Sequence, residues 1–369
     1  MALLQSKGHE VSLFAVHNND IRGFFQKVTT AFLTIYNPWS RRHLSAAIAE
    51  FRPEVVHVHN FFPQLSPSIF FACRDAGVPT VMTLHNFRIL CPTSFLYYDA
   101  RIREHSLKHS SFWTVWSRTF HRSFVGTFFV ACMVDYHKWA GTWKTKVDRF
   151  IALTNSAKEK LVEGGIPRDL IVVKGNCVTR PPEAASNSDE RKGALFVGRL
   201  SPEKGLNILL GAWKGIDYPL RIAGDGPLRE LCESAQNEHI SYLGRLDRDQ
   251  VYSEMARAEF LVMPSIWSET FGLAVIEAFA CGLPVIASRL GSFPDLIEES
   301  ISGLLFSPIE ASSLRETVHW AIAHPREMRE MGERARAHYT EFHTPDVNYA
   351  SLMRVYEYVI RSCHDMRRL

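Results

Sequence analysis

The chain alternates short apolar runs with longer amphipathic segments from its first residues to about position 306. Short runs rich in Val, Ile and Leu are typical of strands that are buried on both faces of a parallel sheet. The segments between them carry apolar residues at helical spacing, and several end at Gly, as helices do. This alternation predicts an α/β fold in which helices connect parallel strands.

The predicted strands fall into two series, and a final predicted helix follows at 346–367. The first series lies at 9–16, 55–59, 80–85, 150–153 and 171–174, and the second at 194–197, 220–223, 240–243, 260–263, 285–287 and 303–306. Residues 180–192 are rich in Pro, Ser and charge and have no apolar period, as expected of a linker. We therefore expect a first domain over 1–182, a linker over 183–192 and a second domain over 193–343. Residues 344–369 are expected to cross back to the first domain.

Two segments depart from the alternation. A helix-like segment that ends at Gly8 precedes the predicted strand 9–16, whereas a parallel α/β domain is expected to begin with a strand. Either the fold lacks its first strand or the sequence has a truncated or misplaced start, and we favour the second interpretation. Residues 86–146 are rich in aromatic and basic side chains. This insertion is expected either to pack as a helical pair on its own domain or to lie on an anionic membrane surface.

Composition narrows the class of protein. Hydrophobic residues make up 46% of the chain and charged residues 22%, as in soluble globular proteins, and no apolar run approaches a bilayer-spanning length. The seven cysteines are scattered without a Cys-x-x-Cys pair and no signal peptide is evident, so a cytoplasmic protein without a metal is expected. Residues 1–175 carry a net charge of +9 and the remainder −6. The basic first half suggests an anionic partner. No nucleic-acid-binding motif is present, and anionic lipid or a phosphorylated acceptor would fit this charge as well as nucleic acid does.

Candidate chemistry gathers where strand 260–263 ends. A polar loop follows it, and then a helix predicted over 271–280 whose first backbone N–H groups suit an anion. Glu269 in the loop and Glu277 on the second helical turn bracket that helix N-terminus. Open α/β sheets bind ligands at the carboxyl ends of their strands, which favours a binding site here. The alternative is that Glu269 only caps the helix and that Glu277 is solvated.

The turns that follow the first two strands of the second series also carry candidate ligand-binding residues. Gly198, Arg199 and Lys204 follow the first of them, and two cations beside helix N–H groups can hold a diphosphate without a metal ion. Gly224 follows the next strand, where a glycine permits close approach of a ligand. We expect Lys204 and Glu277 to be exposed, so that replacing either with Ala would weaken ligand binding and leave the fold intact.

These motifs together resemble a known family. Gly198-Arg-Leu-Ser-Pro-Glu-Lys-Gly205, Gly224-Asp-Gly-Pro227 and Ser268-Glu-Thr-Phe-Gly-Leu-Ala-Val-Ile-Glu-Ala278 are similar to motifs of the group 1, or family-four, retaining glycosyltransferases. The resemblance implies a GT-B fold, in which two Rossmann-like domains face each other across a cleft. It implies transfer of a sugar from a nucleotide-sugar donor to an acceptor hydroxyl, with retention and without cofactor or metal. Bacterial surface polysaccharide or glycolipid assembly is the implied setting, with a sugar, glycolipid or polyprenyl-linked acceptor.

The resemblance also implies roles for individual residues. His85 and Glu269 are the catalytic candidates: His85 would lie under the donor sugar, and Glu269 would hold sugar hydroxyls. Arg199 and Lys204 would clamp the diphosphate, and Glu277 would bind the ribose. The other implied donor-binding residues are Gly198, Gly224, Arg245, Leu246, Phe271, Gly272 and Leu273, of which Arg245 and Leu246 would flank the base.

Two other functions remain open. A nucleotide-sugar epimerase of similar architecture would need acid and base carboxylates spanning the cleft, and the first half shows no such pair. A non-catalytic nucleotide-sugar-binding protein is the second alternative, because the glycine-rich loop that follows the first strand in the family is missing. The family pattern also departs mildly at Gly291-Ser292 and at Asp295, which stand where the family has Gly-Gly and Glu.

Overall fold

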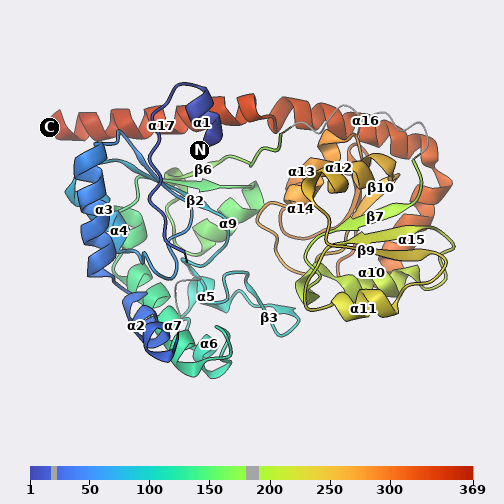
Figure 1. Cartoon of the computed structure of the whole chain (residues 1–369), viewed down its shortest axis with the longest axis horizontal. Coiled ribbons are helices and arrows are strands. Elements are labelled where there is room, and N and C mark those ends of the chain that lie inside the picture. Colours follow the sequence, from blue (N-terminus) through green and yellow to red (C-terminus); the bar gives the residue numbers. More distant parts are fainter. Residues whose placement is uncertain (18–22, 180–190, 369) are drawn as a thin grey trace. The chain divides into compact units, whose positions relative to one another are not determined.

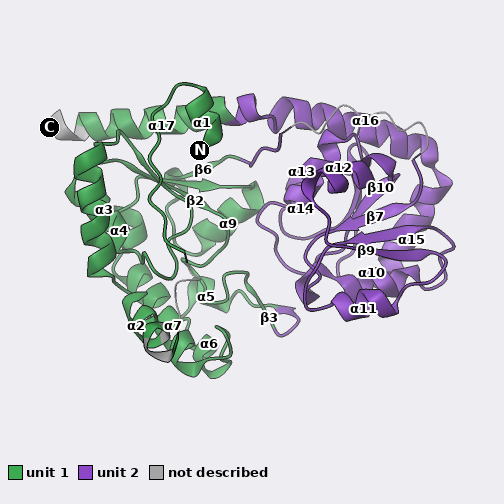
Figure 2. Cartoon of the chain, in the orientation of Figure 1, with its two compact units in different colours: residues 1–98, 102–174, 349–369 green, residues 99–101, 175–348 purple. Residues whose placement is uncertain are grey.

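The computed structural model describes residues 1–17, 23–179 and 191–368 and divides the chain into two compact units (Figures 1 and 2). Unit 1 comprises residues 1–98, 102–174 and 349–369, and unit 2 comprises residues 99–101 and 175–348. The first predicted domain, which runs to 182, thus extends past the end of this division at 174. Most of the predicted linker, 183–190, lies outside the described residues.

Unit 1 is built on a four-stranded parallel sheet of order β1-β2-β5-β6. Its strands are β1 (Val56–Val58), β2 (Thr80–Leu84), β5 (Arg149–Ala152) and β6 (Ile171–Val173). Its helices before the last are α1 (Ala2–Ser6), α2 (Gly23–Leu33), α3 (Pro38–Phe51), α4 (Ser68–Asp75), α5 (His105–Lys108), α6 (Trp113–Trp116), α7 (Phe124–Trp139), α8 (Thr142–Thr145) and α9 (Asn155–Glu163). A short hairpin, β3 (Tyr97–Tyr98) with β4 (Arg101–Ile102), extends from the same half of the chain. The central strand β2 is buried along its whole length, as its continuous apolar sequence predicts.

The predicted strand over 9–16 does not form. These residues follow α1 in an extended path that pairs with none of the four strands of the unit 1 sheet, and Leu13, Phe14 and Val16 are exposed. A strand is held by the ladder of hydrogen bonds to a neighbouring strand, so an apolar run without such a partner stays irregular.

The last helix, α17 (Pro345–Arg368), packs onto the sheet of unit 1 along most of its length. Val355, Tyr356 and Val359 form a buried cluster with Val81 of β2 and Ile151 of β5. Strands β2 and β5 lie in the middle of the sheet, so this helix covers its centre (Figure 1).

Unit 2 is built on a six-stranded parallel sheet of order β12-β11-β10-β7-β8-β9. Its strands are β7 (Ala194–Val197), β8 (Leu220–Ala223), β9 (Ile240–Gly244), β10 (Phe260–Met263), β11 (Val285–Ser288) and β12 (Gly303–Phe306). Its helices are α10 (Leu206–Trp213), α11 (Arg229–Ser234), α12 (Arg248–Arg257), α13 (Leu273–Ala280), α14 (Phe293–Leu296), α15 (Ala311–Ala323) and α16 (Pro325–Phe342). In this order the sheet grows outward from β7 in one direction and from β10 in the other. The two strands therefore flank the point where strand order reverses, which is where open α/β sheets bind ligands.

Candidate functional site

The loops that leave β7 and β10 come together at this reversal point. Lys204 ends a short 3-10 turn after β7, and its Nζ donates to Glu269 Oε1, in the loop after β10, over 2.5 Å. The side chains are 19% and 8% exposed, so the ion pair is largely removed from water. The structure thus brings together the Lys and the loop Glu that the sequence singled out, but the expectation that Lys204 is exposed is wrong.

Glu269 is held by three donors on one oxygen. Besides Lys204, the Ser265 hydroxyl and the Trp267 indole N–H donate to Oε1, over 2.9 and 3.1 Å. The Lys204 ammonium also lies 5.5 Å from the centroid of the Trp267 ring. Within the described part of the chain, the other carboxylate oxygen of Glu269 accepts no hydrogen bond. A fixed carboxylate with one free oxygen is suited to accept a hydrogen bond from a hydroxyl group of a ligand.

Helix α13 begins beside this ion pair. Its first residue is Leu273, and Gly272 precedes it in the left-handed region at φ 87°, so no side chain caps the first turn. Val275 N–H donates to the Gly272 carbonyl, whereas the N–H groups of Gly272 and Leu273 have no acceptor among the described residues and are available to an anion. The predicted helix start at Phe271 is two residues too early: the Phe271 ring is buried against His343, and the Ser292 hydroxyl donates to its carbonyl oxygen.

Arg199 is occupied within its own loop. Its Nη2 contacts Glu203 Oε1 at 2.6 Å, and its Nε donates to the Ser201 hydroxyl over 3.1 Å. The guanidinium side chain is 61% exposed. Burial raises the pKa of Glu203, but hydrogen bonds from Ser201 and the backbone, together with Arg199, outweigh it and leave that pKa below its usual value. The structure therefore places Arg199 at the sheet edge but pairs it with Glu203, which the sequence analysis did not identify as a site residue.

The turns after β7 and β8 are in backbone contact. Gly198 N–H donates to the Ala223 carbonyl, and Gly224 N–H donates to the Gly244 carbonyl over 2.8 Å. A Cβ on Gly224, whose φ is 151°, would lie 1.9 Å from the Gly198 carbonyl oxygen. Only glycine fits there, so this residue allows the turn after β8 to approach the turn after β7 closely. Beyond β9, residue 245 (Arg) is exposed and residue 246 (Leu) is half-buried.

Glu277 lies half-buried on the second turn of α13, so the expectation that it is exposed is wrong. Burial raises the pKa of its carboxyl, and Arg248 opposes this. Arg248 is itself bound to the Thr179 hydroxyl at 2.6 Å and to the Tyr252 hydroxyl at 3.1 Å. No hydrogen bond to the Glu277 carboxylate occurs among the described residues. A half-buried carboxylate without a protein donor is suited to bind hydroxyl groups of a ligand.

A row of three histidines occupies the carboxyl ends of β1 and β2 in unit 1. His59 Nδ1 and His85 Nε2 share a hydrogen bond of 2.9 Å, and their rings are stacked, as are those of His57 and His59. His57 bonds in turn to the Tyr356 hydroxyl at 2.7 Å and the Thr83 hydroxyl at 2.8 Å. His85 is thus anchored through its neighbours to the last helix.

All three imidazoles are neutral in the folded chain near pH 7. Burial, joined by repulsion from neighbouring histidines and Lys174, lowers the pKa of His57 to about 3 and that of His59 to about 4. Burial and Lys174 also lower the pKa of His85. Two neutral rings that share one hydrogen bond must adopt complementary tautomers, so His59 fixes which ring nitrogen of His85 carries its proton.

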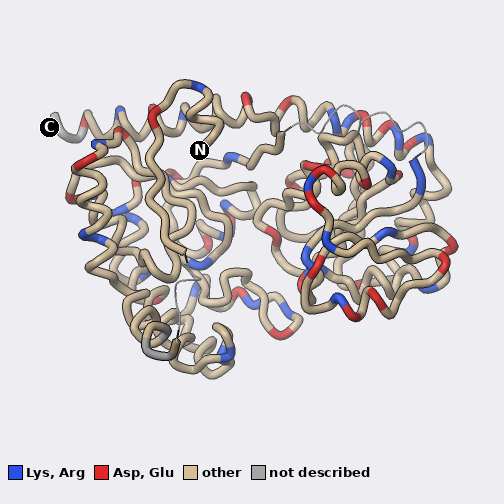
Figure 3. The backbone as a smooth tube through the Cα atoms, in the orientation of Figure 1, with Lys and Arg blue, Asp and Glu red and all other residues tan. Residues whose placement is uncertain are grey.

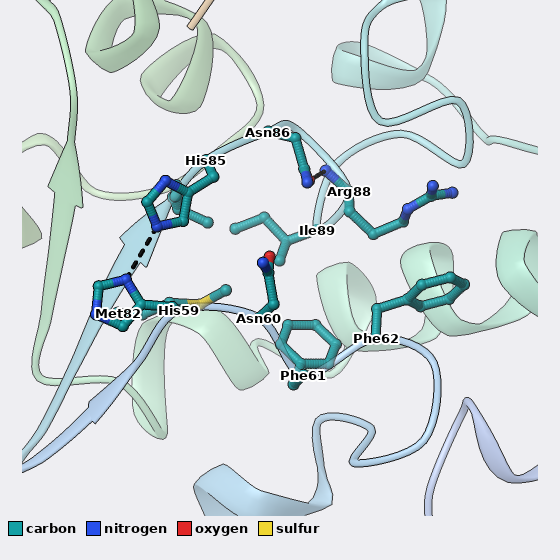
Figure 4. A pocket seen from close by; sticks show the side chains of 10 residues that line it. His59, Asn60, Phe61, Phe62, Met82, His85, Asn86, Arg88 and Ile89 are labelled. Atoms are coloured by element: carbon teal, nitrogen blue, oxygen red, sulfur yellow. Dashed lines mark hydrogen bonds between the residues drawn. The ribbon is translucent and has the colours of Figure 1, made fainter. Parts of the chain in front are cut away.

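A cavity of about 260 Å³ opens beside this row, shown in Figure 4. His59 and His85 line one side, and Asn60 and Asn86 add amide groups. Arg88 lines it too, but its guanidinium donates to the Pro92 carbonyl and the Ser94 hydroxyl and lies 4.6 Å from the Phe62 ring centroid. Burial lowers the pKa of Arg88 to about 10. The Arg88 guanidinium still carries its charge near pH 7 but is engaged by Pro92 and Ser94, so the groups left for a ligand are the neutral imidazoles and amides.

Several residues of these sites were missed by sequence reasoning. Ser265 and Trp267 are short-range neighbours of Glu269 whose contact depends on the loop path, which the sequence does not reveal. His57 and His59 had a usable signal, because alternate residues of a strand share one face and His85 ends the adjacent predicted strand. In the described ranges, no group of three or more His, Cys, Asp or Glu side chains is placed to hold a metal ion. None of the described helices is both long and apolar enough to span a membrane.

Two sequence profiles of known protein families match this chain. A sequence profile described as "Glycosyltransferase Family 4" matches residues 2–179, and one described as "Glycosyl transferases group 1" matches residues 181–338. An uncharacterized glycosyltransferase of Methanocaldococcus jannaschii is 29% identical over 287 residues, which cover 77% of this chain and 69% of that protein. A D-rhamnosyltransferase of Pseudomonas aeruginosa is 35% identical over 156 residues, only 41% of each protein.

Solved structures share the architecture. The crystal structure of the Anabaena protein HepE in complex with UDP aligns with a TM-score of 0.66 at 18% identity, covering 86% of this chain and 81% of that chain. Such neighbours are GT-B proteins with two Rossmann-like domains, and the predicted fold class is confirmed. The chain spans less than half the length of the D-rhamnosyltransferase that it matches.

Proposed function

Because this chain belongs to the group 1, or family-four, glycosyltransferases, we propose that it transfers a sugar from a nucleotide-diphosphate sugar to an acceptor hydroxyl. Retention of the anomeric configuration and independence of metal ions are part of the proposal. The setting that we propose is assembly of a surface polysaccharide or glycolipid, on a sugar, glycolipid or polyprenyl-linked acceptor.

One observation carries the proposal: the buried Lys204–Glu269 pair beside the uncapped first turn of α13. When the bond to the sugar breaks, negative charge accumulates on the departing diphosphate. An ammonium group and backbone N–H groups fixed in advance can stabilise that charge without reorganising, which is the main contribution that a protein makes to such a step. We propose that Lys204 and the N–H groups of Gly272 and Leu273 bind the diphosphate.

The remaining groups around α13 suit the rest of a donor. Three donors saturate one carboxylate oxygen of Glu269. We propose that the other oxygen accepts a hydrogen bond from a sugar hydroxyl. Glu277 is proposed to accept the ribose hydroxyls, and Arg245 and Leu246 to flank the base. The Arg199 side chain is 61% exposed and its charge is screened by water, so its contribution is expected to be smaller than that of Lys204, which is 19% exposed.

We propose that His85 contributes to turnover as a neutral hydrogen-bonding group. Its pKa is lowered by burial and by Lys174, so it is neither a cation nor a strong base at neutral pH. The proton of the acceptor hydroxyl is then proposed to pass to the leaving phosphate. His59 is a positioning residue, because it acts through its hydrogen bond to His85.

The test is a titration followed by a product analysis. UDP, GDP, ADP and dTDP are titrated into the intact chain in EDTA by calorimetry, for the wild type, Lys204→Ala, Glu277→Gln and the control Lys214→Ala, an exposed residue of unit 2. We expect one nucleotide to bind, at least tenfold more weakly to the first two variants and equally to the control. The matching sugar donor is then supplied with candidate acceptors, and NMR should show a product with the donor's anomeric configuration.

Four results would count against the proposal. Nucleotide binding that is unchanged in both Lys204→Ala and Glu277→Gln would contradict the proposed location of the donor site. Binding only with an added divalent ion would contradict independence of metal. Binding without turnover for any donor and acceptor would favour the non-catalytic alternative, and isomerised donor would favour an epimerase.

A further inference from the structure

Helix α7 of unit 1 has apolar residues on all sides. Its inner face is buried and comprises Thr127, Val130, Ala131, Met133, Val134 and His137. Its opposite face is exposed to solvent and comprises Phe124, Val125, Phe128, Tyr136 and Trp139. A helix at a protein surface normally carries polar residues on its solvent side, so an outer face of this composition indicates a second environment.

The turn before α7 extends this apolar face. Trp116 at the end of α6 is 81% exposed, and its ring lies 5.9 Å from that of Phe124. Phe112 is also exposed, with its ring 5.8 Å from that of Phe128. At the far end of α7, Trp139 is 84% exposed. We call the exposed side chains Phe112, Trp116, Phe124, Phe128, Tyr136 and Trp139 the aromatic face.

The two charged side chains of α7, Asp135 and Lys138, are half-buried and are bound by neighbouring residues. Asp135 accepts hydrogen bonds from the Ser110 hydroxyl and the Ser111 N–H, over 2.6 to 3.0 Å. Lys138 Nζ donates to the Ser106 and Leu107 carbonyls. Both charges are therefore paired within unit 1 by the α5–α6 segment.

Cations lie beside the aromatic face instead. Arg118 and Arg122, in the turn between α6 and α7, are exposed, and Lys144 follows on α8. None of the three has an acidic partner among the described residues. Residues 103–146 hold seven Lys or Arg against two Asp or Glu. In Figure 3 the tube around α6 and α7 is mostly tan, with blue at the turn after α6.

We propose that the aromatic face, with Arg118, Arg122 and Lys144, is a docking surface for a membrane that contains anionic lipid. Trp and Tyr rings with one polar edge prefer the boundary between headgroups and acyl chains, and adjacent cations are attracted to anionic headgroups. No helix needs to cross the bilayer. This proposal stands apart from the proposed transfer reaction and places the protein where a lipid-borne acceptor would be found.

Charge argues against the other possible occupants. A symmetric dimer places the same patch on both subunits, so the unpaired cations of one copy would face those of the other. Nucleic acid would use the cations but would leave most of the exposed apolar rings without a partner. An anionic membrane satisfies both the rings and the cations.

The experiment is flotation of the intact chain with vesicles of phosphatidylcholine alone and with 30 mol% phosphatidylglycerol, a probe composition at about 0.1 M salt. We expect binding only with the anionic lipid. Trp116→Ser and Trp139→Ser should each weaken binding about tenfold, because an exposed ring loses apolar contact with the interface. Arg118→Gln with Arg122→Gln should weaken it about thirtyfold, since each cation near the surface contributes about fivefold. Trp320→Ser, an exposed Trp of α15 in unit 2, is the control.

The variants should fold normally, because the substituted side chains are exposed; unchanged melting temperatures verify this. No binding to anionic vesicles, or equal loss in the Trp320→Ser control, would overturn the proposal. A dimer in sedimentation that dissociates in Trp116→Ser would assign the face to a second copy of the chain. Because flotation contains no donor and nucleotide titration contains no lipid, failure here is distinguishable from failure of the proposed transferase function.

Discussion

Replacing Lys204 with Met tests whether the pair at the sheet reversal point has the energetics that its burial implies. The substitution removes the ammonium but keeps a chain of similar length over Trp267. It leaves the Glu269 carboxylate, 8% exposed, with only two neutral donors. A carboxylate that loses its cation in such a place keeps the cost of leaving water without the attraction that offset it.

The expected cost follows from that burial. Breaking a buried ion pair from one side costs about 3–5 kcal/mol, and the two remaining donors reduce this to about 2–3 kcal/mol here. Unit 2 is of a size at which 1 kcal/mol shifts the melting temperature by about 2–4 °C, so its transition should fall by about 4–12 °C. Lys204→Met with Glu269→Gln should cost less than the sum of the single changes, by about 1–3 kcal/mol, because each single change strands the partner.

Calorimetric melting of the wild type, both single variants and the double variant measures this cycle, at 0.15 M and 1 M NaCl. The coupling should persist at high salt, because a pair removed from water is screened little. Exposed Lys214→Met is the matched control and should change the melting temperature by less than 2 °C, about 0.5 kcal/mol. Additive single changes, or a loss for Lys204→Met no greater than for the control, would refute the reasoning.

Three further changes probe other parts of the structure. The folded pKa of His57, about 3, lies below its usual 6.5, so the stability from its neutral form is complete above pH 6.5 and is lost as pH falls toward 3. In denaturant unfolding, the wild type should therefore lose up to about 2 kcal/mol more stability between pH 8 and pH 5 than His57→Gln does. The same pH dependence in both proteins would contradict this. Gly224→Ala should lower the melting temperature of unit 2 by several degrees, whereas Gly211→Ala in α10, where the Cβ meets only ordinary contact, should not. Because burial raises the pKa of Glu277, its charged form destabilises the fold at high pH. The stability of Glu277→Gln should therefore match or exceed that of the wild type at pH 8 and equal it below about pH 4.5, while nucleotide binding is still weakened. A variant less stable than the wild type at pH 8 would contradict the direction of this pKa shift.

Hydrophobic patterning predicted the core of the fold closely. The predicted bounds of β7, β8, β10 and β12 coincide with those observed, because each is an apolar segment ended by Gly, Pro or a polar turn. Strand 9–16 failed for the opposite reason: an apolar run specifies a strand only where a neighbour supplies the other half of the ladder. A single sequence does not reveal whether that neighbour exists.

The candidate site was predicted in its residue types but not in its contacts. Sequence motifs located Lys204, Glu269 and Glu277, yet the expectation that Lys204 and Glu277 are exposed was wrong. A charged residue that follows a strand is normally predicted to lie at the surface. Only the three-dimensional path of the loop after β10 shows that Glu269 covers the ammonium group of Lys204. The pairing of Arg199 with Glu203 had a local signal, since the two residues stand four positions apart in one turn.

The most direct test of the central claim is a crystal structure of the intact chain grown with the nucleoside diphosphate that binds it most tightly, in EDTA. We predict that the β-phosphate accepts hydrogen bonds from the N–H groups of Gly272 and Leu273 and contacts Lys204 Nζ, with the ribose on Glu277. A diphosphate bound elsewhere, or one that leaves the first turn of α13 and Lys204 untouched, would contradict the assignment.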